Sequence, residues 1–322
     1  MSKDYDAVIK NSKSYINSDS LKVDLGVLLG RTYTDKGDYK TAIPYLINTI
    51  NKDTHNSWRK AWALACIGTC YFMTQNYDKS RKAIQECIEL NSTKNATNYA
   101  HKRLLLFGFD TTYKNWEIVK SNNFRFHFQN MSSSDIKNFV STRENAFQKI
   151  NNFFNSKLPK KIDFFVWKSR NTAKILLNKR LGFANPEFCI VHSHYQQTKG
   201  HEMTHIISYY STDIIKTTSF INEGTAVYFD QTNQDKNKIV KVWIKANDRK
   251  IKIKEIWANW SEFPVELSYP LSSLFVRELI NNFGREKFID FFKNQTYANA
   301  KLVFGNKLDK VIIDFEKQIN WL

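Results

Sequence analysis

The chain has 322 residues, of which 42% are hydrophobic and 15% aromatic, enough for two domains with buried cores. No apolar run follows the charged first residues, and nowhere do about 18 uncharged apolar residues follow one another, so we expect a cytoplasmic protein without a signal peptide or membrane-spanning helix. The net charge of +17 would suit nucleic acid or an anionic membrane, unless the basic residues are spread over solvated surfaces.

Two segments, 28–50 and 66–90, repeat one pattern at an offset of 38 positions. Each reads as a helix, a short polar turn and a second helix. Gly30 and Gly68 occupy equivalent positions, where a small residue lets the partner helix approach. Because one such pair cannot bury its apolar face alone, we expect further helical units from residues 97–109 and 1–20.

The repeated pattern resembles the tetratricopeptide repeat, with Leu29-Gly30, Tyr33 and Ala42 on the family's L-G, Y and A positions. Both copies depart from that pattern, since Ser80 replaces the second small residue and no proline closes either unit. The resemblance implies an all-α repeat domain over residues 1–110 that recognises a protein partner or substrate. The alternative is a helical pair that only packs against the next domain.

The cysteines are too few and too irregularly spaced for a disulfide framework, and no two of them form a C-x-x-C pair. We expect all of them to be buried, reduced thiols. They are Cys66, Cys70, Cys87 and Cys189.

From residue 111 the pattern changes to short apolar runs. Residues 123–129, 161–168 and 187–194 are predicted strands, and 133–154 is a predicted helix with one apolar stripe. From residue 198 onward the sequence reads as helical. We therefore predict a second domain over 111–322, with an α+β part at 111–232 and a helical subdomain at 233–322.

The segment "GHEMTH" (200–205) places two histidines four residues apart. On a helix these share a face, so His201 and His205 can present two imidazoles to one metal ion. Glu202 is rotated by about 100° and reaches the side where a water would lie. Thr198 is a candidate N-cap of this helix.

A tetrahedral zinc ion needs a third protein ligand. The stretch "SFINEGTAVYFD" (219–230), read as a second helix capped by Thr218 or Ser219, carries Glu223 in its early turns. The metzincin alternative is excluded, because residues 206–214 lack the H-x-x-G-x-x-H continuation. Glu223 is therefore the predicted third ligand, which leaves a fourth position open for one Zn²⁺ per chain.

The helix pair resembles the gluzincin metallopeptidases, specifically the bacterial peptidase-MA-type families with N-E-G-x-A-x-Y on the second helix. The resemblance covers roughly residues 115–322 and includes the helical segments 269–294 and 303–322. It implies a thermolysin-like fold with zinc on the three predicted ligands and Glu202 as the general base. The spacer of 17 residues between His205 and Glu223 is short for the family, and a G-x-M-E-N segment is absent, which argues against a typical aminopeptidase.

Peptide hydrolysis needs further groups beside the ligands and the base. Tyr269 is the candidate that stabilises the oxyanion, with His192 and His194 as competitors. Asn222 and Asp230 are candidates for holding a histidine ligand, although Asp230 would equally suit a surface carboxylate. An edge strand that holds the peptide substrate by strand addition is expected at Cys189, Ile190, Val191 and His192.

The densest basic stretch, residues 236–255, has lysines interspersed with apolar residues at helical spacing. This pattern is typical of a solvated amphipathic helix, so nucleic acid is an unlikely partner. Three classes of function remain open. The first is a zinc metallopeptidase whose repeats recruit a peptide or protein substrate. The others are a non-catalytic binding scaffold and a regulator that binds nucleic acid or anionic lipid.

Overall fold

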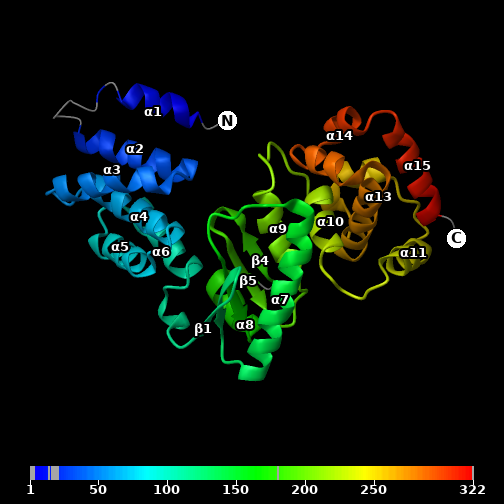
Figure 1. The fold of residues 1–322 in the computed structure, drawn as a ribbon, viewed down its shortest axis with the longest axis horizontal. Helices are drawn as coiled ribbons and strands as arrows, with labels where there is room; N and C mark the ends of the chain where they lie inside the picture. The colour runs from blue at the N-terminus through cyan, green and yellow to red at the C-terminus, as the bar shows by residue number, and fades with distance from the viewer. Residues whose placement is uncertain (1–3, 14, 16–21, 180, 321–322) are drawn as a thin grey trace. The chain divides into compact units, whose positions relative to one another are not determined.

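The computed structural model describes residues 4–13, 15, 22–179 and 181–320. The chain is mostly helical and carries a five-stranded mixed sheet (Figure 1). It divides into two compact units, each described here by itself. The first unit comprises Met1–Trp116 and Lys174–Asn178, and the second comprises Glu117–Ala173 and Lys179–Leu322.

The first unit is built of antiparallel helices that pair in chain order. Gly30 and Gly68 lie where two helices of a pair come closest, and an added Cβ would be 2.4 Å from Leu46 and 2.6 Å from Ile84. Glycine at both positions therefore permits the repeated helix pairs. The helices are α1 (Tyr5–Lys13), α2 (Lys22–Lys36), α3 (Tyr39–Lys52), α4 (Trp58–Met73), α5 (Tyr77–Leu90) and α6 (Lys94–Leu106), followed by the 3-10 turn Thr111–Tyr113.

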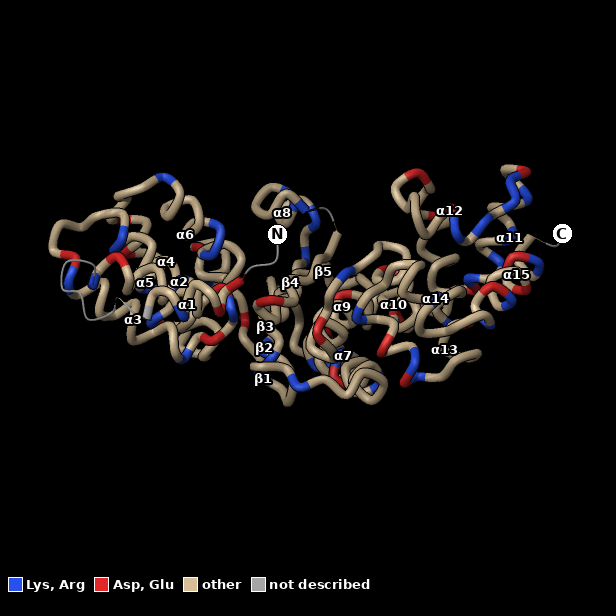
Figure 2. Tube along the Cα trace, turned by 90° about the horizontal axis from the view of Figure 1, so that it is seen from above, with Lys and Arg blue, Asp and Glu red and all other residues tan. Residues whose placement is uncertain are grey.

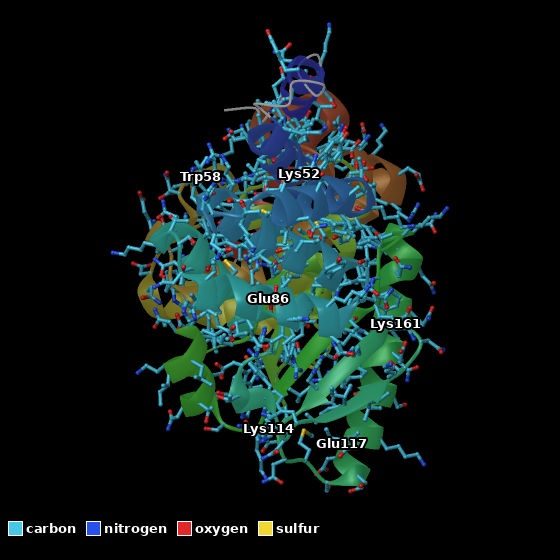
Figure 3. The ribbon with its side chains drawn as sticks, turned by 90° about the vertical axis from the view of Figure 1, so that its left-hand side faces the viewer. Lys52, Trp58, Glu86, Lys114, Glu117 and Lys161 are labelled. Carbon is cyan, nitrogen blue, oxygen red and sulfur yellow. The ribbon has the colours of Figure 1, made fainter. Side chains whose placement is uncertain are left out.

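Helices are found in both regions that were expected to extend the repeats. Helix α6 covers most of the predicted segment 97–109, and α1 covers part of 1–20, whose residues 1–3, 14 and 16–20 lie outside the described structure. Lys52 at the end of α3 and Trp58 at the start of α4 lie on the surface of this unit (Figure 3).

The prediction of buried, reduced cysteines is confirmed. All four are free thiols enclosed in the interior. Burial raises the pKa of Cys70 to about 12 and those of Cys87 and Cys189 to about 11, because the thiolate would lose its hydration there. These thiols are therefore held in the neutral form.

The sheet of the second unit has the order β1-β2-β3-β5-β4. Strand β3 pairs in parallel with β2 and β5, while β1 and β4 are antiparallel edge strands. Alternate residues of the three inner strands, such as Phe126 and Phe164, pack against α7 (Ser133–Phe154) in one apolar core. The strands are β1 (Glu117–Lys120), β2 (Phe124–Phe128), β3 (Ile162–Trp167), β4 (Phe183–Asn185) and β5 (Ile190–His194), and α8 (Arg170–Leu177) follows β3.

The opposite face of the sheet buries a charged cluster around Asp163. Its carboxylate accepts hydrogen bonds from Arg125 at 2.9 Å and His127 at 3.1 Å, and it also pairs with Lys160. Burial alone would raise the pKa of Asp163, but these three neighbours outweigh it and hold the pKa far below its ordinary value. Asp163 is therefore a buried carboxylate.

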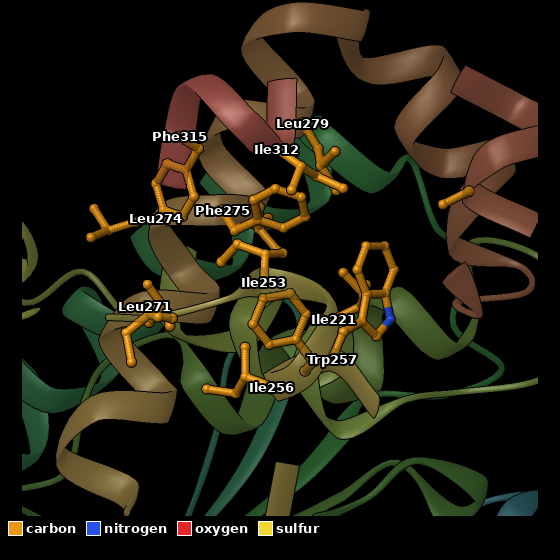
Figure 4. Packing of buried hydrophobic residues seen from close by; sticks show 14 of the residues in the cluster. Ile221, Ile253, Ile256, Trp257, Leu271, Leu274, Phe275, Leu279, Ile312 and Phe315 are labelled. Atoms are coloured by element: carbon orange, nitrogen blue, oxygen red, sulfur yellow. The ribbon is translucent and has the colours of Figure 1, made fainter. Parts of the chain in front are cut away.

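The remainder of the second unit is helical. A core that includes Trp257, Phe275 and Phe315 joins these helices (Figure 4). Helix α13 is interrupted at Gly284, which has a φ of 80°. The helices are α9 (His201–Tyr209), α10 (Ser219–Tyr228), α11 (Lys236–Asn247), α12 (Ile253–Ala258), α13 (Val265–Phe292), α14 (Tyr297–Phe304) and α15 (Lys307–Asn320), with a 3-10 turn at Trp260–Glu262.

The basic stretch 236–255 forms two helices rather than one. Helix α11 ends before Asp248, whose φ of 45° is left-handed, and α12 begins at Ile253. Val240 and Ile244 are buried while Lys241 and Lys245 are exposed, as expected for an amphipathic helix. Lys and Arg elsewhere are interspersed with Asp and Glu along both units (Figure 2). Within the described ranges, every helix is too short or too polar to cross a membrane.

Candidate metal centre

Helix α9 presents both histidines of the H-E-x-x-H motif on one face. The rings of His201 and His205 lie 5.1 Å apart between centroids, at an interplanar angle of 81°. The helix begins two residues later than expected, because its N-cap is Gly200 and no side chain caps it. Thr198 is therefore not the cap that the sequence suggested.

Helix α10 brings Glu223 to the same place. The predicted cap is confirmed at Thr218, whose hydroxyl accepts a hydrogen bond from the N–H of Ile221. Glu223 Oε2 lies 3.3 Å from His201 Nε2 and 3.7 Å from His205 Nε2. All three potential ligand atoms lie within 4.8 Å of one another. The two helices thus converge on one point, as the sequence analysis expected of the three ligands.

The separations between the Glu223 carboxylate and the two imidazoles fit a tetrahedral metal ion. Zinc bonds of about 2.0–2.2 Å to imidazole nitrogen and carboxylate oxygen place tetrahedral ligand atoms about 3.3–3.6 Å apart. The two histidine-to-carboxylate separations lie at or near that range. Two imidazoles and one carboxylate supply three donors, one fewer than a closed four-ligand structural zinc site has.

The same three groups also interact electrostatically, as the shifts of their pKa values show. Burial would raise the pKa of Glu223, but hydrogen bonds and charge from His201 and His205 lower it to about 2. Burial would likewise lower the pKa of His201, but Glu223, Glu202 and Asp230 raise it. Glu223 is therefore held as a carboxylate between the two imidazoles.

Glu202 lies beside the ligands without joining them. Its pKa is raised, chiefly because the carboxylate is buried, and the two histidines only partly offset this. The N–H of Ala184 in β4 donates a hydrogen bond to the carboxylate. In the described part of the chain, Glu202 forms no ion pair with the ligand histidines. It is thus held at the site and is available to exchange a proton.

Asn222 contacts a ligand histidine, whereas Asp230 does not. The amide nitrogen of Asn222, Nδ2, lies 3.2 Å from Nδ1 of His205. The carboxylate of Asp230 instead accepts hydrogen bonds from Thr232 and Lys236. The hypothesis that Asp230 accepts a histidine N–H is therefore wrong for the described structure, in which Thr232 and Lys236 donate to its Oδ1 and neither histidine of the H-E-x-x-H motif is a partner. Asp230 acts on His201 only through its charge.

Tyr269 faces the metal site from the second turn of α13. Its ring lies 6.2 Å from that of His201 and 5.4 Å from that of Trp260. Its pKa is raised to about 12 by burial, then by the charges of Glu223 and Glu202 and by a hydrogen bond to Glu223. The phenol therefore keeps its proton and can donate it in a hydrogen bond.

The edge strand lies elsewhere than the sequence suggested. Strand β5 is an inner strand between β3 and β4, so Ile190 and Val191 are buried, and Cys189 is in a left-handed turn before it. The edge beside α9 is β4, a strand of three residues that the sequence analysis missed. The prediction of an edge strand at 189–192 is therefore wrong. Pro186 and a 3-10 turn separate β4 from β5, and β4 rather than β5 is the edge strand.

The two competing histidines are also displaced from the site. His192 is buried on the far face of β5, where the indole N–H of Trp167 donates to its Nδ1 at 3.1 Å. His194 Nε2 lies 3.1 Å from the carbonyl oxygen of Lys168. Neither histidine lines the cleft over the metal site, whereas Tyr269 does. Among the three candidates, only Tyr269 is placed to contact a substrate.

The metal site forms the floor of a cleft of about 900 Å³. Its walls come from β4, α9, the 210–218 loop, α10 and the first turns of α13. Sequence reasoning missed most of the wall, since residues such as Phe183 and Ile214 belong to no motif. Its described lining is Arg170, Leu181, Gly182, Phe183, Ala184, Pro186, Gln196, Gln197, Thr198, His201, Glu202, His205, Ser208, Tyr209, Ile214, Thr217, Asn222, Glu223, Val265, Glu266, Tyr269 and Phe292.

No protein-family model matches the sequence, and no curated protein matches it significantly. The chemistry of the site therefore has to be inferred from its own residues. Two imidazoles, two carboxyl groups and a protonated phenol face one cleft. Groups of these types can hold a metal ion and exchange protons.

Proposed function

We propose that this protein is a zinc-dependent metallopeptidase of the gluzincin type. The observation that carries the proposal is the convergence of His201, His205 and Glu223 within 4.8 Å at the floor of a cleft. The adjacent Glu202 and the opposing Tyr269 support it, because a purely structural metal site needs neither. The thermolysin-like fold and the tetratricopeptide-like character of the first unit belong to the same proposal.

The proposed ligands are Nε2 of both histidines and the carboxylate of Glu223. Zinc, when bound, supplies Lewis acidity that lowers the pKa of a water and polarises the scissile carbonyl. Asn222 orients His205 for this task. Binding through Nε2 requires the proton on Nδ1, so the amide of Asn222 must turn its oxygen toward that ring nitrogen.

Glu202 is the proposed general base. It accepts a proton from the attacking water and later delivers that proton to the leaving amine. A carboxyl with a raised pKa is suited to both transfers, because its two protonation states lie closer in free energy near neutral pH. The Ala184 N–H holds the carboxylate on the side of the site next to β4.

Tyr269 is the proposed hydrogen-bond donor to the developing oxyanion. Its phenol is protonated and points into the cleft beside Glu223. A donor fixed in a partly buried site stabilises developing charge more strongly than one in water. Because Tyr269 also contacts the ligand carboxylate, it lies close to the place where the carbonyl oxygen would be polarised.

Strand β4 is the proposed support for the peptide backbone. The N–H of Ala184 points away from β5, since it donates to Glu202, so this edge of the sheet faces the cleft. An extended substrate could add as a further strand along it. The helical first unit is proposed to recruit a protein substrate or partner.

Elemental analysis and substrate profiling test the proposal together. We expect one zinc per chain, lost in His205→Ala, and cleavage of a proteome-derived peptide library that disappears in Glu202→Gln while zinc is retained. Zinc without Glu202-dependent cleavage would contradict the peptidase. A chain that binds a captured partner equally well with and without the three ligands would favour the scaffold.

A further inference from the structure

Arg143 of α7 is buried without a charged partner. Its side chain is 5% exposed, and in the described part of the chain no carboxylate pairs with it. The guanidinium lies over the ring of Phe139, 3.7 Å from the ring centroid, and its Nε has no hydrogen-bond partner there. Burial lowers the pKa of Arg143 to about 10. Because a buried, unpaired charge costs free energy, packing alone does not account for an arginine at this position.

The guanidinium reaches from α7 to the segment that precedes α9. Nη2 of Arg143 donates a hydrogen bond to the carbonyl oxygen of Gln197 at 3.0 Å, while Nη1 donates to Thr142 Oγ1 of its own helix at 3.2 Å. Gln197 lies four residues before His201, the first residue of α9 and a proposed metal ligand. Arg143 therefore joins α7 to the segment that leads into the candidate metal site.

Gln197 is in turn fastened to β5 through its side chain. Its Oε1 accepts hydrogen bonds from Ser193 Oγ at 2.9 Å and from the N–H of His194 at 3.0 Å. Its own N–H donates to the carbonyl oxygen of His194 at 2.9 Å. An added Cβ at Gly182, just before β4, would clash with the same Oε1. One residue thus links β5 and the approach to β4 with the guanidinium on α7.

Helix α7 also contacts the other end of this segment. Gly200, the N-cap of α9, packs so closely that an added Cβ would clash with Phe229 O and lie 3.3 Å from Ile150 Cδ1. Ile150 lies seven residues after Arg143, which is two helical turns further along the same face of α7. Residues 197–200 are therefore held at both ends by α7, and part of this segment lines the cleft over the metal site.

We propose that Arg143 is a positioning residue, whose hydrogen bond to Gln197 fixes residues 197–200 and thereby the place at which α9 presents His201. Three ligands hold one metal ion tightly only when their separations are fixed, so a displaced His201 weakens the whole set. The net contribution of Arg143 to stability is small, because desolvation of its charge offsets its hydrogen bonds. This inference rests on the metal-dependent function proposed above.

Zinc affinity and the melting temperature of the metal-free chain, measured on the same variants, test the inference. We expect Arg143→Met to weaken zinc binding about tenfold while changing the melting temperature by no more than about 4 °C. Arg143→Lys keeps a donor for Gln197 and should restore part of the affinity. Lys149→Met removes an exposed charge from the same helix and is the matched control, with unchanged affinity. Parent-like affinity in Arg143→Met, or no recovery in Arg143→Lys, would overturn the inference.

Gln197→Ala gives a second route, in which Arg143 stays in place. It removes the hydrogen bonds that Oε1 accepts and should also weaken zinc binding. Because both changes loosen the same segment, the double variant should lose less affinity than the product of the two single losses. Losses that simply multiply would show that Arg143 does not act through Gln197.

Hydrogen exchange of the metal-free chain separates this inference from the peptidase function. Amide exchange in the peptide that covers residues 195–201, read by mass spectrometry, should be about tenfold faster in Arg143→Met and unchanged in Lys149→Met. Faster exchange and weaker zinc binding, in a parent chain that cleaves no peptide, would refute the peptidase and retain the role of Arg143. Exchange equal to that of the parent would refute the role of Arg143 even where the parent cleaves peptides.

Discussion

Gly224 lies against the backbone of Ser272, so closely that an added Cβ would be 2.8 Å from the Ser272 carbonyl oxygen. This contact joins α10, which carries the ligand Glu223, to α13, which carries Tyr269. The glycine directly after the ligand therefore sets how near the two helices approach. The position of Tyr269 over the candidate metal site therefore depends on the absence of a side chain at Gly224, which packs against α13 about one turn from Tyr269.

We expect Gly224→Ala to destabilise the protein and to weaken zinc binding. Alanine gains about 1 kcal/mol of helix propensity, but the clash is with backbone, and overpacking costs about 1–3 kcal/mol. The cost of overpacking should exceed the gain in helix propensity, so the melting temperature measured by calorimetry should fall. Ser219→Ala, on the exposed first turn of α10, is the control. An unchanged melting temperature and zinc affinity in Gly224→Ala would show that α13 shifts freely.

Asn222 is expected to set the affinity for zinc through His205. Asn222→Ala removes the acceptor for the Nδ1 proton and should weaken binding about 10- to 100-fold. Asn222→Asp keeps an acceptor there and should preserve most of the affinity. Competition with a chelating indicator measures both variants. Equal losses of zinc affinity in the two variants would mean that the Asn222 side chain acts by packing and not as a hydrogen-bond acceptor.

Local periodicity explains which parts of the site could be predicted from sequence. Two histidines four apart share a helix face whatever the fold, and Glu223 follows on a helix whose cap, Thr218, is visible. Strand β4 escaped prediction because three residues before Pro186 show no alternation. The partners of Asp230 escaped it too, since Lys236 and Thr232 reach its carboxylate only through the turn after α10.

The helical units of the first unit could also be predicted in part from the sequence. The spacing of Gly30 and Gly68 reflects a close helix contact that recurs, and the structure has helix pairs there. The end of α11 was not foreseen, because Asp248 adopts a left-handed conformation that its neighbours do not signal. Charge interspersed with apolar residues indicates an amphipathic face but not where a helix stops.

Zinc is expected to stabilise the folded chain. A ligand that binds only the native state at 100 times its Kd adds about 2.7 kcal/mol, and in a domain of about 150–250 residues each kcal/mol raises the melting temperature by about 2–4 °C. Chelation should reverse the shift, and Glu223→Gln should reduce it. Mg²⁺ at the same concentration is the control, since it prefers oxygen ligands. An equal shift in a variant lacking His201, His205 and Glu223 would place the ion elsewhere.

The buried cluster at Asp163 is expected to govern acid stability of the sheet. The pKa of Asp163 is lower in the folded chain than the ordinary value of about 3.9 that applies after unfolding, so folding favours the charged form. Its contribution is therefore complete above about pH 4 and declines as the pH falls below that value. Asp163→Asn leaves Lys160 and Arg125 without their carboxylate in a buried site, which costs about 3–5 kcal/mol.

Urea unfolding at pH 7 and pH 3 measures both effects, and the difference in unfolding free energy between parent and variant should shrink at pH 3. Asp290→Asn, at an exposed ion pair with Lys293, should change little at either pH. A constant difference across the two pH values would show that the Asp163 side chain stabilises the sheet by packing and not by its charge.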